Sequence, residues 1–172
     1  MTTRRDVRRT PARSTTAASK SEVVWWTVMP SESHWGMTPR QSIEQECERR
    51  GERAVVSGCV ALLRGRSVDG DLIMALGGPP ADWVRTRGEP GPDYWLRVWA
   101  ARGLLYAWHG SARSAVHSAL NDEAWRVREM ALRVVAQHGL GEERTLVEVM
   151  TRQDDSARVR AAATKALRRL DA

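Results

Sequence analysis

Few residues of this chain are placed to do chemistry, and the strongest group among them lies around Asp93. Three tryptophans follow this carboxylate within 15 positions, namely Trp95, Trp99 and Trp108. Indole rings beside a carboxylate could hold an extruded nucleobase by stacking and cation–π contact, while the carboxylate stabilises developing positive charge. A second interpretation is structural: Asp93 caps a helix, and Trp95 and Trp99 belong to the packing stripe of that helix.

The sequence contains no other catalytic or metal-binding pattern. Cys47 and Cys59 are twelve positions apart and form no Cys-x-x-Cys pair, so we interpret them as small buried residues in a reducing compartment. None of the four histidines has the spacing of a zinc site, and His138 falls on an apolar helical stripe. Nucleophile-elbow, phosphate-loop and dinucleotide motifs are also missing. We therefore expect no catalytic residue, no cofactor and no metal.

The net charge of +6 is concentrated in the first 20 residues. That segment has six Lys or Arg against one Asp, whereas residues 37–172 have 21 Lys or Arg against 18 Asp or Glu. Most of the chain is therefore nearly balanced in charge. This weakens any argument for nucleic-acid binding that rests on the isoelectric point alone.

Residues 1–36 are predicted to be a disordered extension, basic and rich in Ser and Thr. The first part of it has only Val7 as a sizeable aliphatic residue after the initiator, too little to offset the entropy of ordering. Such a tail either binds polyanions loosely or only solvates the chain, and an apolar run at 23–29 could pack as an extended segment. A further hypothesis is that translation starts at Met37, where a clean helical pattern begins.

Nothing in the sequence indicates a membrane protein. No run approaches the ~18 apolar residues of a membrane span, and no apolar segment of the signal-peptide type follows the basic N-terminus. We therefore expect a cytoplasmic protein without a membrane partner.

After the extension, the sequence reads as helices separated by short breakers. Thr38 and Gln41 form a capping box with Pro39 at the first helical position, which predicts a helix that ends near Arg50. The Gly- and Pro-rich segment at 88–92 is the clearest loop. Further helices are expected at 52–63, from Asp69 or Asp71 to 76, in a short turn through Val84, and over 93–108.

The C-terminal part contains an internal repeat with an offset of 32 residues. Residues 122–128 and 154–160 share the pattern Asp-x-x-x-Arg-Val-Arg, and the apolar positions that follow coincide in both copies at helical spacing. A shorter helix precedes each copy. Helix pairs that repeat every ~30–45 residues are typical of solenoids, in which each pair buries its apolar face against the next. We therefore predict an all-α fold, an α-solenoid of stacked helical hairpins with roughly four pairs after the N-terminal tail.

This pattern resembles the HEAT repeat family, including short bacterial HEAT-like repeats of the phycobilin-lyase type. The resemblance covers residues 122–135 and 154–167. A weaker copy at 96–105 keeps an Arg-Val pair but has Trp99 where the next copy has Arg128. The resemblance implies one HEAT-like domain, which we place after the extension, over residues 37 to 172.

The resemblance also implies roles for the charged residues of the motif. In the family, the Asp before the second helix and the Arg early in it form a ladder between adjacent repeats. This assigns a structural role to Asp122, Arg128, Asp154 and Arg160. Because one fold carries many functions, the resemblance says little about what the domain does.

The surface left for a partner is rich in arginine. Trp125 lies off the apolar stripe beside Arg126, and an exposed Trp next to Arg is typical of a protein-interface hot spot. Arg133 and Arg158 lie on or near the polar faces of the same two helices. Acidic residues alternate with these arginines in the sequence, and they favour the competing interpretation that this surface is an ordinary solvated face. We predict a non-catalytic protein–protein interaction or scaffolding module that binds an unidentified protein through these four residues.

Two alternatives stay open. The first is a nucleic-acid-binding module, since some HEAT-like DNA glycosylases use an acidic residue with tryptophans, a role that would fall to Asp93. The second is an accessory factor of another enzyme, as in HEAT-like lyases that act on tetrapyrroles.

Overall fold

The computed structural model describes residues 36–86, 88 and 91–172, and within these ranges every regular element is helical. The expectations for residues 1–35 lie outside the described residues. Three 3-10 turns occur at Pro79–Ala81, Gly110–Ala112 and Gly141–Glu143. The helices are α1 (Pro39–Arg50), α2 (Glu52–Leu63), α3 (Gly70–Gly77), α4 (Trp83–Thr86), α5 (Tyr94–Gly103), α6 (Arg113–Ala119), α7 (Trp125–His138), α8 (Arg144–Gln153) and α9 (Ala157–Leu170).

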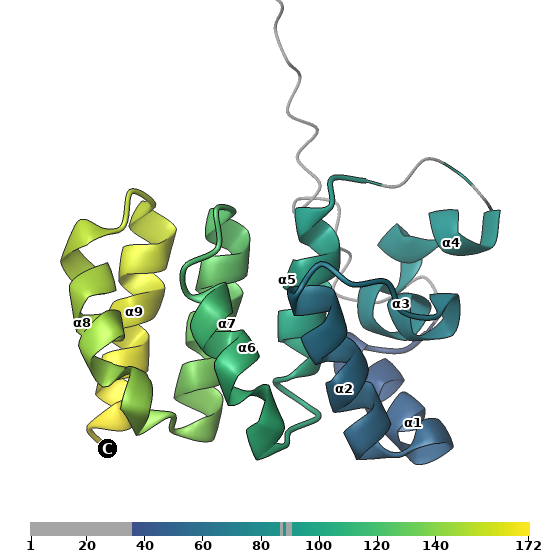
Figure 1. Ribbon diagram of the computed structural model, residues 1–172, viewed down its shortest axis with the longest axis horizontal. Helices are drawn as coiled ribbons and strands as arrows, with labels where there is room; N and C mark the ends of the chain where they lie inside the picture. Colours follow the sequence, from purple (N-terminus) through teal and green to yellow (C-terminus); the bar gives the residue numbers. More distant parts are fainter. Residues whose placement is uncertain (1–35, 87, 89–90) are drawn as a thin grey trace, which may run out of the picture.

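The helices stand side by side in pairs (Figure 1). The hairpins α6–α7 and α8–α9 are consecutive in the chain, and α8–α9 lies at one end of the row. Helix α5 packs against α7 on one side and against α2 and α3 on the other. Its pair partner α2 is therefore not its neighbour in sequence, because α3 and α4 come between them. The succession of adjacent hairpins holds in the C-terminal part and is interrupted in the first half.

Local capping explains where the first helices begin and end. As predicted, Thr38 and Gln41 form a capping box: the Thr38 hydroxyl accepts from the Gln41 N–H at 3.3 Å, and Gln41 Oε1 accepts from the Thr38 N–H at 2.8 Å. Helix α1 ends at Arg50, and Gly51 caps it with a φ of 89°, which suits glycine. Of the two candidate N-caps for α3, the structure has Asp69, whose carboxylate accepts a hydrogen bond from the Leu72 N–H at 3.0 Å.

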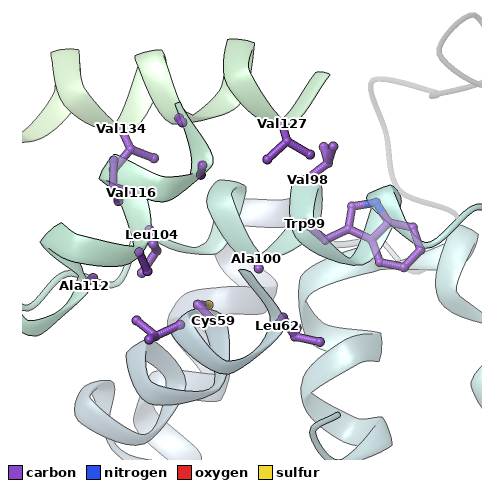
Figure 2. Packing of buried hydrophobic residues seen from close by; sticks show 14 of the residues in the cluster. Cys59, Leu62, Val98, Trp99, Ala100, Leu104, Ala112, Val116, Val127 and Val134 are labelled. Atoms are coloured by element: carbon purple, nitrogen blue, oxygen red, sulfur yellow. The ribbon is translucent and has the colours of Figure 1, made fainter. Parts of the chain in front are cut away.

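One continuous core runs through the described helices, and part of it depends on a close helix approach. Figure 2 shows Cys59 of α2 and Leu104 at the end of α5 within this cluster, and both are fully buried. A Cβ added at Gly103 would lie 2.7 Å from Cys59 Sγ and 2.6 Å from Leu76 Cδ2. Only glycine therefore lets α5 approach α2 and α3 so closely.

Helix α5 is shorter than predicted. The expected helix over 93–108 ends at Gly103, because the N–H groups of Leu105 and Tyr106 bond three residues back and tighten the turn. The carbonyl of Leu104 then finds its partner in His138, whose Nε2–H donates to it at 2.7 Å. Trp108, which lies beyond the end of α5, stacks on the His138 ring, with centroids 4.2 Å apart. His138 therefore fastens the end of α5 to α7.

The repeat appears in the structure with the predicted period. Helices α7 and α9 both span 14 residues and begin 32 positions apart. The shorter helices before them, α6 and α8, begin 31 positions apart, each after a 3-10 turn. Helix α8 is three residues longer than α6, and its linker to the following helix is two residues shorter, which accounts for the one-residue difference.

Candidate interaction surface

Two ion pairs join the N-terminal ends of the helices α5, α7 and α9. Arg97 Nε lies 2.7 Å from Asp122 Oδ2, and Arg128 Nε lies 2.8 Å from Asp154 Oδ2. Each arginine also reaches the exposed acid that follows its partner. The Arg128–Asp154 pair is the more buried, with side chains 12% and 6% exposed. Each rung links one helix pair to the next, and we refer to these rungs as the ion-pair ladder.

Electrostatics in the ladder favour the charged forms. Burial alone would raise the pKa of Asp154, but hydrogen bonds from Arg128 and from the Ser156 N–H outweigh it and hold this pKa below its usual value. The hydrogen bond to Asp154 also raises the pKa of Arg128. The pair stays ionised because each charge has its partner inside the protein.

The ladder corrects the register of the weak repeat copy. Arg97 makes the contact in its repeat that Arg128 makes in the next, so Arg97, not Trp99, holds the equivalent position. At the resulting offset of 31, Ala100 falls on Ala131, and both are buried. The predicted alignment is wrong by two residues, because it followed the adjacent letters Arg-Val instead of the buried positions.

The last arginine of the motif, Arg160, makes only half of these contacts. Its Nη1 donates to the carbonyls of Asp154 at 2.7 Å and Asp155 at 3.2 Å, just as Arg128 Nη1 binds the two carbonyls before its own helix. Among the residues that the structure describes, no carboxylate pairs with Arg160. The ladder therefore consists of two ion pairs, Arg97–Asp122 and Arg128–Asp154, and of Arg160, which binds only backbone carbonyls.

A second row of contacts runs beside the ladder, and we call it the stacked cluster: Tyr94, Trp95, Trp125, Arg126 and Arg158. The guanidinium carbon of Arg126 lies 4.4 Å from the ring centroid of Trp125, 5.6 Å from that of Trp95 and 5.8 Å from that of Tyr94. Arg158 lies 5.6 Å from the Trp125 ring. Each arginine thus contacts an aromatic ring of the preceding repeat, at distances where cation–π attraction is effective.

The structure changes the expected role of Trp125. This side chain was predicted to be an exposed hot spot, but it is half-buried, because Arg126 and Arg158 contact its ring. Tyr94 was not among the predicted site residues. The corrected offset of 31 would have identified Tyr94, because it aligns Tyr94, the first residue of α5, with Trp125, the first residue of α7.

The polar sides of α7 and α9 carry the remaining cations. Arg126 is half-buried, whereas the others are exposed and lie away from the buried stripe. Arg133 pairs with Glu129 at 2.8 Å. We call this surface the basic face: Arg126, Arg133, Arg158, Lys165, Arg168 and Arg169.

Acids that interleave with these cations in sequence are engaged elsewhere. Asp122, Asp154 and Asp155 bind arginines of the ladder, and Asp171 pairs with Arg144 of α8. Glu129, in contrast, pairs with Arg133 within the basic face, and Glu123 and Asp155 are exposed beside it. The binding surface and the ordinary solvated face therefore both stay predictions.

Asp93 and its tryptophans do not form an open site. Trp99 is only 4% exposed and packs so closely on Gly77 that a Cβ there would lie 2.8 Å from its ring. Trp108 is stacked on a histidine instead of facing Asp93. Asp93 occupies the predicted N-cap position of α5, but its side chain makes no capping hydrogen bond. A nucleobase could not stack on Trp99 without unpacking the core.

The described residues offer no alternative site for metal chemistry. Within those ranges, no group of three or more His, Cys, Asp or Glu side chains could hold a metal ion. Both thiols are free, and burial raises the pKa of the Cys59 thiol to about 12. None of the helices that the structure describes is long and apolar enough to cross a membrane.

Comparison with protein families matches residues 89–168 to HEAT repeats. Comparison with curated proteins and with solved structures gave no match. The matched segment contains the ladder and the stacked cluster, and it spans α5 to α8 with nearly all of α9. The part of the chain that builds this surface belongs to the HEAT repeat family.

Proposed function

We propose that this protein is a non-catalytic interaction or scaffolding module whose protein partner binds across the stacked cluster and the basic face. HEAT repeats generally mediate protein–protein interaction. The observation that carries the proposal for this chain is the stacked cluster, in which Arg126 lies within 6 Å of three aromatic rings at the ends of two repeats.

This arrangement suits binding for an energetic reason. A long arginine side chain loses rotamer entropy when a partner fixes it, at a cost of about 0.5–1.5 kcal/mol. Contact with Trp125, Trp95 and Tyr94 restricts Arg126 before any partner arrives. The planar guanidinium stacks through its face and still donates hydrogen bonds through its edge. Trp, Tyr and Arg are also the residues most enriched in interface hot spots.

We also propose a cytoplasmic location. Both cysteines are free thiols, and cytosolic proteins keep their thiols reduced. Cell fractionation with a reporter for the soluble cytosolic fraction tests this proposal, which fails if the protein is recovered outside that fraction.

Affinity capture of the full chain from native lysate tests the interaction. The experiment compares four proteins: wild type, Trp125→Ala, Arg126→Glu and a control, Arg152→Glu. Each is captured from nuclease-treated and from untreated lysate. Arg152 is exposed on α8 and belongs neither to the stacked cluster nor to the basic face. We expect wild type to capture a defined protein partner from both treated and untreated lysate. The two cluster variants should lose this partner, and the control should retain it. Loss of the partner after nuclease, or equal loss with Arg152→Glu, contradicts the proposal.

A further inference from the structure

Helix α9 has an unusual charge composition. It contains five basic residues and no acidic one: Arg158, Arg160, Lys165, Arg168 and Arg169. The acids on either side are engaged by other helices, since Asp154 and Asp155 bind Arg128 and Asp171 binds Arg144. In the described part of the chain, no carboxylate pairs with Arg160, Lys165, Arg168 or Arg169.

The charge continues on α7 at matching positions. With the 32-residue offset, Arg126 aligns with Arg158, and Arg133 aligns with Lys165. Two basic rows thus run across the helices, and adjacent packed helices lie roughly 8–10 Å apart. An extended polypeptide covers that distance in about three residues. A segment with acidic residues at such intervals would meet one cation on each helix.

The surroundings of the basic face favour a polypeptide over a nucleic acid. Single-stranded nucleic acids are held by stacking bases on aromatic rings, but guanidinium groups already lie over Trp125 and Trp95. Glu123 and Asp155 flank the cluster, and their side chains are 89% and 88% exposed. A phosphate backbone carries charge at every nucleotide and would be repelled there, whereas a polypeptide can place neutral residues beside these acids.

From this geometry we infer that the basic face binds an acidic segment of a partner polypeptide. The partner's carboxylates pair with Lys165, Arg168 and Arg169 on α9 and with the edge of Arg126 on α7. This inference rests on the proposed interaction function and specifies the chemistry of the partner. Ion pairs with exposed cations are screened by salt, so binding weakens as ionic strength rises.

Fluorescence anisotropy of the full chain tests the inference with three labelled probes of equal length. These are a peptide of alternating Glu and Ala, the same peptide with Gln in place of Glu, and oligothymidylate. The test variant is Lys165→Glu/Arg168→Glu. The control, Arg66→Glu/Arg152→Glu, changes the net charge equally on exposed residues that lie outside the basic face. Thermal melts establish that each variant is folded, and Lys165→Gln/Arg168→Gln provides a milder version of the test variant.

We expect the Glu peptide to bind more tightly than either other probe. The test variant should weaken that binding about tenfold or more, the Gln variant less, and the control hardly at all. Absence of Glu-peptide binding, tighter oligothymidylate binding, or equal loss in the control overturns the inference. If the Glu peptide fails to bind while capture still finds a partner that Trp125→Ala loses, the acidic partner is wrong and the interaction function stands. If the Glu peptide does not bind and capture finds no partner, both the acidic partner and the interaction function are wrong.

Discussion

The ion-pair ladder makes a quantitative prediction, because the repeat supplies a matched pair of arginines. Arg128 and Arg160 occupy equivalent positions, but only Arg128 pairs with carboxylates. In Arg128→Gln, the Asp154 side chain, which is 6% exposed, loses its ionic partner. Removing one member of a buried pair typically costs 3–5 kcal/mol. Asp154 keeps its hydrogen bond from the Ser156 N–H, so we expect about 3 kcal/mol, at the lower end of that range.

The matched variant Arg160→Gln should cost much less. Arg160 loses only its hydrogen bonds to the carbonyls of Asp154 and Asp155, which together are worth about 1 kcal/mol. Loss of the Arg128 rung weakens the contact between α7 and α9 specifically. In a repeat protein, stability is a sum of nearest-neighbour terms, so the α8–α9 hairpin should then unfold before the rest of the protein.

Urea unfolding measured with two probes can detect this separation. No tryptophan follows Trp125 in the sequence, so tryptophan fluorescence reports on the part before α8, while circular dichroism reports on all helices. In wild type and Arg160→Gln we expect coincident transitions, whereas in Arg128→Gln the dichroism should change first. Equal costs for the two variants, or coincident transitions in Arg128→Gln, would refute the reasoning about the ladder.

Three further predictions concern the packing of the first helices. Gly103→Ala should destabilise the protein by about 1–3 kcal/mol in urea unfolding, because its Cβ would overlap Cys59 Sγ and a leucine of α3; an unchanged midpoint would contradict this. Cys59 should resist alkylation at pH 8 until the protein unfolds, because burial raises its thiol pKa to about 12, whereas the half-buried Cys47 should react sooner. The hydrogen bond from Arg50 lowers the pKa of Asp69 to about 2, below the usual 3.8 of an aspartate. This ion pair therefore stabilises the fold above about pH 4 and is lost as pH falls towards 2, and Arg50→Ala should remove that part of the acid sensitivity in pH-dependent melts.

Much of the C-terminal architecture could be predicted because its signals are local. The pattern that starts at Asp122 and returns at Asp154 fixes the start of α7 and α9, since each helix is set by its own turn and apolar stripe. The cap at Thr38 likewise depends only on residues within the same turn.

The pairing of α2 with α5 could not be predicted on such grounds. An apolar stripe shows that a helix is covered but does not say by which other helix. Helices that are adjacent in the sequence usually pair, but α3 and α4 separate α2 from α5 in the chain, so this rule could not identify the pair. The close approach at Gly103 depends on Cys59, which lies in a different helix, and the sequence gives no sign of that contact.

The burial of Trp125 was missed for a similar reason. One of the side chains over its ring is Arg158, which belongs to the next repeat and lies 33 positions away. The predicted register of the weak copy failed because a two-letter match was weighed above the pattern of buried positions. Contacts between repeats, not within them, decide which side chains form this surface.

Site-specific photo-crosslinking in cells tests the central claim most directly. A photoreactive amino acid replaces Arg133 or Lys165 on the basic face, or Arg152 or Ser118 on the shorter helices as controls. The account predicts discrete protein adducts from the first two positions and none from the controls. Adducts from all four positions, or adducts with nucleic acid alone, would contradict the claim that α7 and α9 present the surface that binds a protein partner.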